Sequence, residues 1–167
     1  MELKWFLGIV GVGEACINVL FCYLALILDD WIDHSPFPRV GLWTGWSDMP
    51  SWVKPTRAMM FLGLFATIGT TVTASIFVKK NIKVFLFITI GLAVVSGIFM
   101  LAGYLIFSEA TSHLGLRGGN GSSFCIRACI LAWGIAITYA FVFILSKREL
   151  PPANLVHASL NPLETHM

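Results

Sequence analysis

VFLFITIGLAVVSGIFMLAGYLIF, residues 84–107, is the stretch that decides the fold class. It carries no charged residue, and as one helix it is long enough to cross the roughly 30 Å hydrocarbon core of a bilayer. Residues 5–28, 58–78 and 124–145 are also long and mainly apolar, and 57% of the 167 residues are hydrophobic. We therefore predict an all-α membrane protein whose four transmembrane helices form an up-down bundle.

The lengths of the connections predict the domain organisation. Residues 1–150 hold the four spans and leave no room for a soluble domain, so we expect one transmembrane domain with outer loops at about 29–55 and 108–123. Residues 151–167 are interrupted by prolines, and we expect a disordered cytoplasmic tail. The first span is too long for a signal-peptide core and no small-residue cleavage site follows it, so we expect it to be retained.

The distribution of basic residues predicts the orientation. Lysine and arginine are nearly balanced between the two sides, but three lysines crowd the short connection between the second and third spans. Lys4 precedes the first span, and Lys147 and Arg148 end the fourth. Cytoplasmic segments of multi-pass proteins carry the excess of such residues. We therefore expect a multi-pass protein of the plasma membrane with both termini in the cytoplasm.

Charge and histidine placement argue against several function classes. The net charge of +2 comes from clusters at the membrane edge without interleaved aromatic residues, unlike the pattern of a nucleic-acid-binding protein. No set of polar residues converges at one membrane face, as the sites of small four-helix membrane enzymes require. We expect no enzyme, metal or cofactor, and the histidines lie outside the spans: His34, His113, His157 and His166.

Small residues recur at every fourth position on all four spans. This spacing lets helix backbones approach closely in lipid, where packing must drive association. The stripes either hold the monomer together or form the seam of a homo-oligomer. The longest lies on the fourth span and shorter ones on the others: Ala128, Ala132, Ala136 and Ala140; Ala66, Thr70 and Ala74; Gly11 and Ala15; Ala93 and Gly97.

Glu14 is the one acidic residue deep in a span, where such residues are costly. Asn18 lies one turn further along the same face and can hydrogen-bond to it. Thr70, Thr73 and Thr138 lie at matching depth on other spans. Glu14 is then either a protonated residue satisfied inside the bundle or, with Asn18, an intramembrane contact for a partner's helix or a lipid headgroup.

All four cysteines, Cys16, Cys22, Cys125 and Cys129, fall in or at the spans. Cys22 and Cys129 lie at similar depth, which allows a bridge, but we expect buried thiols that pack as small apolar groups. Cys125 and Cys129 form a C-x3-C pattern, which differs from the C-x-x-C of thiol oxidoreductases.

The predicted first outer loop is rich in tryptophan. Trp31 and Trp52 lie next to spans, where tryptophan commonly anchors a protein at the membrane interface. Trp43 lies mid-loop and needs another reason, and residues 40–44 have a weak strand pattern. Charged residues also gather near this side, and we expect four of them to form an acid–base cluster that ties the helix tops together: Asp29, Asp30, Arg57 and Arg127.

Five motifs follow one another along the chain: Trp31, Gly41-Leu42-Trp43, Arg57, Tyr104 and Trp133. Their order resembles the claudin superfamily, and within it the branch of peripheral myelin protein, the epithelial membrane proteins and the lens fibre intrinsic membrane protein. The resemblance implies a small extracellular β-sheet built from the first outer loop. The family's first-loop disulfide cannot form, because no cysteine lies between Cys22 and Cys125, so that sheet must rest on aromatic burial.

The resemblance implies a non-enzymatic protein of cell junctions or cell adhesion, which organises membrane contacts or assemblies with a second copy or a protein on an opposing cell. The alternative is an auxiliary subunit of an ion channel or receptor, and a small four-helix membrane enzyme is the third reading. Asn120 begins a glycosylation sequon on the predicted outer side. Thr165 lies two residues before the terminal Met167, a pattern that PDZ domains accept.

Overall fold

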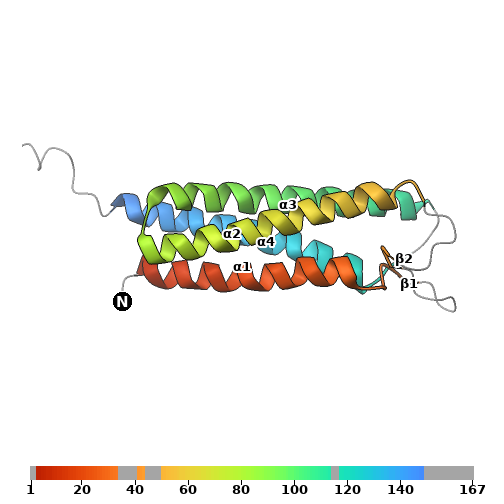
Figure 1. Cartoon of the computed structure of the whole chain (residues 1–167), viewed down its shortest axis with the longest axis horizontal. Helices are drawn as coiled ribbons and strands as arrows, with labels where there is room; N and C mark the ends of the chain where they lie inside the picture. The colour runs from red at the N-terminus through yellow and green to blue at the C-terminus, as the bar shows by residue number, and fades with distance from the viewer. Residues whose placement is uncertain (1–2, 34–40, 44–49, 114–116, 149–167) are drawn as a thin grey trace, which may run out of the picture.

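The structure is a computed structural model that describes residues 3–33, 41–43, 50–113 and 117–148. Helices make up most of it: α1 (Leu3–Ile27), α2 (Val53–Lys80), α3 (Lys83–Ser112) and α4 (Asn120–Arg148). They run side by side in one elongated bundle (Figure 1). All four are long and apolar enough to cross a membrane. The predicted all-α four-helix bundle is therefore confirmed, and the chain is built as a multi-pass integral membrane protein.

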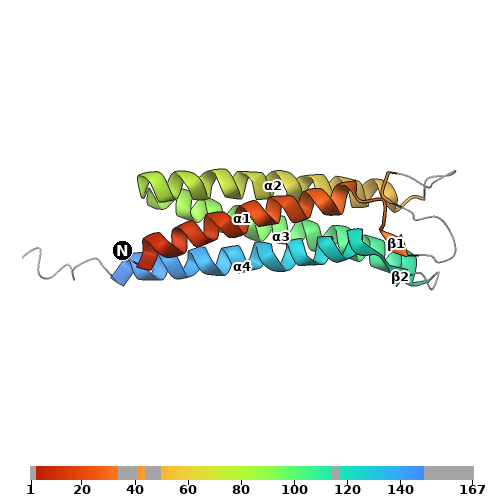
Figure 2. The same cartoon turned by 90° about the horizontal axis from the view of Figure 1, so that it is seen from below.

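Each helix packs against its neighbours in the chain, and α1 also packs against α4, which closes the bundle. The start of α1, the turn between α2 and α3 and the end of α4 lie at one end (Figures 1 and 2). The end of α1, the start of α2 and the strands β1 (Ile32–Asp33) and β2 (Arg117–Gly118) lie at the other end, called the loop end below. The first end is called the basic end, after Lys4, Lys79, Lys80, Lys83 and Lys147.

At the loop end, three helices extend past the apolar stretches that predicted them. α2 begins at Val53 rather than at residue 58, α3 ends at Ser112 rather than at residue 107, and α4 begins at Asn120 rather than at residue 124. Apolar length marks only the part of a helix suited to hydrocarbon, and the helix continues while its backbone hydrogen bonds can form. The connection between α3 and α4 is therefore shorter than the outer loop predicted at 108–123.

The turn between α2 and α3 is tight because Asn81 adopts the left-handed conformation, with φ 51° and ψ 33°. Its backbone N–H donates to the Phe77 carbonyl oxygen at 2.7 Å and closes the end of α2. Asparagine tolerates this conformation better than most residues with a side chain. Lys79 and Lys80 occupy the last turn of α2, where the helix dipole favours positive charge.

One short antiparallel pairing lies at the loop end of the described chain. β1 (Ile32–Asp33) pairs with β2 (Arg117–Gly118), with Ile32 opposite Gly118. The Gly-Leu-Trp motif at 41–43 is not in a strand, so the strand predicted at 40–44 is wrong for these three residues. Residues 40 and 44 lie outside the described ranges, as do residues 34–39 and 45–49 of the first outer loop. The pairing joins the connections after α1 and α3, and a sheet built from the first outer loop is not shown.

The stripes of small residues face the interior of the bundle. Ala128 and Ala132 of α4 are fully buried, as are Ala15 of α1 and Ala74 of α2. Large apolar side chains point outward instead, and 70% of Ile137 is exposed. This distribution fits membrane helices that approach one another through small residues and present large ones to lipid.

Hydroxyl groups join α2 to α3 in the middle of the bundle. Thr67 Oγ1 and Ser96 Oγ lie 2.5 Å apart, and Ser96 Oγ also donates to the Gly63 carbonyl oxygen at 3.0 Å. Nearer the basic end, Thr89 Oγ1 donates to Thr73 Oγ1 at 2.9 Å. Such hydrogen bonds between membrane helices stabilise a bundle by about 0.6–2 kcal/mol each.

Candidate functional site at the loop end

Two indole groups cap the carboxyl end of α1. The last carbonyl groups of a helix have no partner within it, and at a membrane edge an unsatisfied carbonyl is costly. The Ala25 carbonyl oxygen accepts from Trp31 Nε1 at 2.7 Å. The Leu26 carbonyl oxygen accepts from Trp43 Nε1, also at 2.7 Å. Two tryptophans that are far apart in the loop sequence therefore bond to successive carbonyls of one helix end.

Trp31 is buried inside the protein, with 1% of the residue exposed. Its ring meets Phe107 of α3 edge to face, with centroids 5.0 Å apart, and Phe107 also contacts Trp52 at 5.7 Å. Gly121 of α4 leaves room for the indole, because a Cβ there would lie 2.6 Å from its Cδ1 atom. The expectation that Trp31 anchors at the lipid interface is therefore wrong, since it is a core residue between α3 and α4.

The three residues of the Gly-Leu-Trp motif have three different roles. Gly41 lies against the end of α1, and a Cβ there would come within 2.5 Å of the Asp29 Cα. Leu42 is fully buried in the core at the loop end. Trp43 stays 46% exposed while its N–H reaches α1. Glycine allows the close approach, leucine supplies apolar burial, and tryptophan caps the helix.

Arg57 fastens the motif to α2. Its Nε donates to the Leu42 carbonyl oxygen at 2.8 Å, and its Nη2 donates to the same oxygen. Its guanidinium carbon lies 4.3 Å from the centroid of the Trp43 ring, which is a cation–π arrangement. Trp43 also meets Phe61 of α2 edge to face, at 6.0 Å between centroids. We call Trp31, Gly41, Leu42, Trp43 and Arg57 the loop-end cluster.

Asp30 joins the end of α1 to the start of α4. Its carboxylate accepts from Asn120 Nδ2 at 2.6 Å, and its carbonyl oxygen accepts from the Gly121 N–H at 2.8 Å. The Gly119 N–H donates to the Trp31 carbonyl oxygen, also at 2.8 Å. Asn120 is exposed, and its glycosylation stays a prediction. A glycan would attach to the same nitrogen that bonds to Asp30.

The acid–base cluster predicted at the helix tops is not formed as one unit among the described residues. Asp30 pairs with Asn120, and Arg57 bonds to the Leu42 carbonyl. Arg127 lies over Phe124, with its guanidinium carbon 5.3 Å from the ring centroid. The described contacts of the two arginines are with a backbone carbonyl oxygen and with aromatic rings, where the prediction assigned carboxylates. The spacing of residues in the sequence does not reveal where such groups lie.

Glu14 of α1 is hydrogen-bonded to α4. Thr138 Oγ1 donates to Glu14 Oε2 at 3.2 Å. Asn18, the partner expected from the sequence, is 1% exposed and instead accepts a weak contact from Cys22 Sγ at 3.9 Å. The contact with Thr138 favours the reading in which Glu14 is satisfied between α1 and α4. Glu14 is only half-buried, so it lies at the margin between the interior and the lipid.

All four cysteines are free thiols. Cys22, Cys125 and Cys129 are buried, as expected for thiols that pack as small apolar groups. The Cys129 thiol donates to the Gly97 carbonyl oxygen at 3.4 Å. Cys16 is exposed, so the expectation of burial is wrong for this residue. It follows the fully buried Ala15 directly, and successive helix residues face different directions.

The sequence interpretation missed several contacts that cross between helices. Trp133, one of the residues behind the family resemblance, is 42% exposed and lies over Gly97, where a Cβ would overlap its indole. Tyr104 packs, half-buried, against the loop-end core. Phe107 was not singled out, although it meets two tryptophans. A glycine on one span can face an aromatic residue on another, as Gly97 faces Trp133. A single sequence does not show which glycine and which aromatic residue meet.

The loop-end cluster can position a loop and present the exposed Trp43. Within the described ranges, no group of three His, Cys, Asp or Glu side chains is placed to hold a metal ion. Thr165 and Met167, the predicted PDZ ligand, lie outside those ranges. Neither a scan against protein-family models nor a search of curated proteins found a match. The function proposed below therefore rests on the chain's own residues and geometry.

Proposed function

We propose that this chain is a non-enzymatic, claudin-like membrane protein that organises membrane contacts, junctions or assemblies of membrane proteins. The loop end is the platform from which the first outer loop meets a partner. That partner is a second copy or a protein on an opposing cell. The protein lies in the plasma membrane with both termini in the cytoplasm.

The loop-end cluster is the observation that carries this proposal. Trp31, Trp43 and Arg57 each donate to a backbone carbonyl oxygen at the end of α1 or in the connection that follows it. Side chains that bond to backbone in this way fix the path of a loop. Residues 41–43, held against the helices by these bonds with Trp43 half-exposed, suit protein recognition, in which tryptophan and arginine often dominate the binding energy.

The proposed orientation is supported by the charges at the two ends. The basic end carries five described lysine side chains, and its described residues include no acidic side chain. The loop end carries both signs, including Asp29, Asp30 and Lys54. The lysine-rich end is the one that the positive-inside rule assigns to the cytoplasm. The loop-end cluster then faces outward.

A second candidate function is an auxiliary subunit of an ion channel or receptor. A hollow of about 340 Å³ on the outer side of α2 favours it, lined by Thr71, Val72, Ser75, Ile76 and Lys79. Ser75 is exposed there, and its hydroxyl donates to the Thr71 carbonyl oxygen at 2.8 Å. Small hydroxyl side chains on a membrane face allow a partner's helix to approach closely.

Co-purification of the full-length protein in mild detergent tests both functions. A homo-oligomer supports membrane organisation, as does a partner captured from an opposing cell that Trp43→Ala no longer captures when equal amounts of the two proteins are at the cell surface. A stoichiometric channel or receptor lost with Ser75→Leu supports the auxiliary role. Each variant is the control for the other, because one changes the loop end and the other a lipid-facing side of α2. A surface-delivered protein that purifies as a monomer without a partner contradicts both.

A PDZ protein is a further proposed partner, bound by Thr165 and Met167 at the C-terminus. The terminal peptide would add as a strand to the edge of the domain's sheet, with its carboxylate held by backbone N–H groups. A peptide of residues 158–167 should capture PDZ domains from a purified panel. Equal capture by the Thr165→Ala peptide contradicts this mode of binding.

A further inference from the structure

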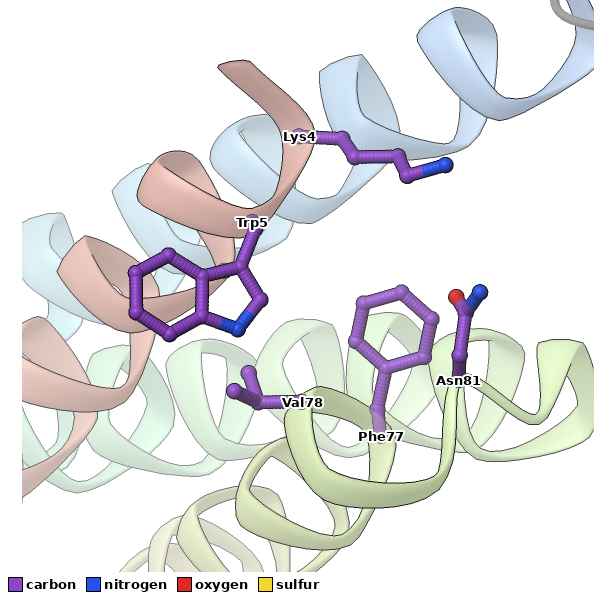
Figure 3. Close-up of a pocket in the computed structure, with 6 residues that line it drawn as sticks. Lys4, Trp5, Phe77, Val78 and Asn81 are labelled. Atoms are coloured by element: carbon purple, nitrogen blue, oxygen red, sulfur yellow. The ribbon is translucent and has the colours of Figure 1, made fainter. Parts of the chain in front are cut away.

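A hollow opens between the start of α1 and the end of α2 at the basic end (Figure 3). Its volume is about 170 Å³. Gly8 lines it and allows α1 to approach α2 closely, because a Cβ there would lie 3.1 Å from Val78 Cγ2. Lys4 and Trp5 come from α1, and the opposite wall comes from α2. The full lining is Lys4, Trp5, Gly8, Phe77, Val78 and Asn81.

The lining combines a polar mouth with an apolar wall. The ammonium group of Lys4 and the side-chain amide of Asn81 lie on the same side of the hollow (Figure 3). An ammonium and an amide N–H are both donors that suit a phosphate oxygen. The rings of Trp5 and Phe77, with Val78, form the apolar part. A ligand that matches this lining has an anionic group next to hydrocarbon.

The position of the hollow and the surrounding charge support the same ligand. Trp5 lies near the first residue of a membrane-spanning helix, the level at which tryptophan meets lipid headgroups. Lys79 and Lys80 lie in the last turn of α2, and Lys83 begins α3. Basic residues gathered at a membrane edge attract anionic lipid.

We propose that this hollow binds an anionic phospholipid of the adjoining leaflet. Its phosphate lies against Lys4 and Asn81, and the upper part of an acyl chain lies against Phe77 and Val78. The orientation proposed above places the site in the cytoplasmic leaflet, where anionic lipids are abundant. The binding chemistry itself does not depend on that orientation.

Quenching of Trp5 by brominated lipid tests the site in the full-length protein. The protein is placed in phosphatidylcholine nanodiscs with increasing amounts of brominated phosphatidylserine or brominated phosphatidylcholine. The difference between wild type and Trp5→Phe isolates the Trp5 signal. Brominated phosphatidylserine is expected to quench that signal at a several-fold lower mole fraction. Equal quenching by the two lipids overturns the proposal.

Three variants separate the hollow from the general charge of the basic end. Asn81→Gly removes the amide but keeps the left-handed turn, and it should lower the phosphatidylserine preference about two- to fivefold. Lys4→Gln should lower it about fivefold. Lys147→Gln is the matched control, because this lysine lies at the same end but over Phe143, with its Nζ 5.1 Å from the ring centroid.

The control and a soluble competitor also decide the outcome. The preference should be unchanged in Lys147→Gln and in the presence of inorganic phosphate. A loss in Lys147→Gln equal to that in Lys4→Gln would show attraction to the whole basic end and overturn the site. An unchanged preference in both pocket variants overturns it too. Loss of the phosphatidylserine preference in the wild type when inorganic phosphate is added would assign the hollow to a soluble anion instead of a lipid.

Discussion

The guanidinium of Arg57 lies over Trp43, with its central carbon 4.3 Å from the ring centroid, and it also donates to the carbonyl oxygen of Leu42. One cation near the start of α2 therefore holds both the side chain and the preceding carbonyl of the loop motif. Trp43 in turn caps α1 through the Leu26 carbonyl. All four cysteines are free thiols and lie within helices, so these non-covalent contacts are not reinforced by a disulfide.

The Trp43 indole N–H should contribute to stability separately from its ring. Trp43→Phe keeps an aromatic face for Arg57 but leaves the Leu26 carbonyl without its donor. We expect a loss of about 1–3 kcal/mol in the free energy of unfolding, measured by thermal or denaturant unfolding in detergent. Trp43→Ala should lose more and impair delivery to the cell surface, whereas reducing agent should leave the wild type unaffected.

The control for Trp43 is Trp5→Phe, which removes an indole that is 47% exposed at the opposite end of the bundle. Its unfolding should match that of the wild type. Unchanged unfolding of Trp43→Phe would show that the Leu26 carbonyl does not depend on the indole cap.

Arg57→Lys should weaken the loop-end cluster although it preserves the charge. Lysine has no planar fork with which to bond the Leu42 carbonyl and stack on Trp43 at once. We expect a loss of about 1–3 kcal/mol in unfolding free energy. Arg127→Lys is the matched control and should cost less, because exposed Arg127 contacts Phe124 at a longer 5.3 Å. Equal effects of the two substitutions would argue against a special role for Arg57.

The four spans and the bundle could be predicted because apolar length is a property of the sequence alone. The helix ends could not, since α2 and α4 begin in mixed segments before their apolar stretches. The tight turn between α2 and α3 also depends on the left-handed backbone conformation of Asn81, which the sequence of that turn does not indicate.

The candidate site was predicted in its members but not in its contacts. The motif pointed to Trp31, Trp43 and Arg57, yet the acceptors of their hydrogen bonds are backbone carbonyl oxygens, which every residue carries. A sequence therefore cannot name them. For the same reason the sequence did not indicate that Arg57 bonds to the Leu42 carbonyl oxygen.

Gly41 should not tolerate a side chain. A Cβ in Gly41→Ala would come within 2.5 Å of the Asp29 Cα, and backbone cannot move aside as a flexible side chain does. We expect lower unfolding stability by about 1–3 kcal/mol and reduced delivery to the cell surface. Gly13→Ala is the control, because a Cβ there meets nothing within 4 Å and alanine favours the helix. Equal stability of the two variants would contradict the close approach.

Glu14→Gln should preserve folding and partner binding if Glu14 only joins α1 to α4. The glutamine carbonyl oxygen still accepts from Thr138, so the contact survives without charge. Thr138→Val removes the donor and should lower the unfolding free energy by about 0.6–1.7 kcal/mol. Both are measured by unfolding in detergent and by co-purification. A partner lost in Glu14→Gln, with folding retained, would instead identify an intramembrane recognition site.

The lysine-rich basic end should face the cytoplasm. Ser51→Cys and Lys83→Cys each place a thiol at an exposed position, the first next to α2 at the loop end and the second at the start of α3. A membrane-impermeant thiol reagent on intact cells should label Ser51→Cys but label Lys83→Cys only after permeabilisation. The wild type reports the background, because its own cysteines lie within helices that span the membrane. Labelling of Lys83→Cys alone on intact cells would reverse the orientation, place the loop-end cluster in the cytoplasm, and exclude contact with an opposing cell through that cluster.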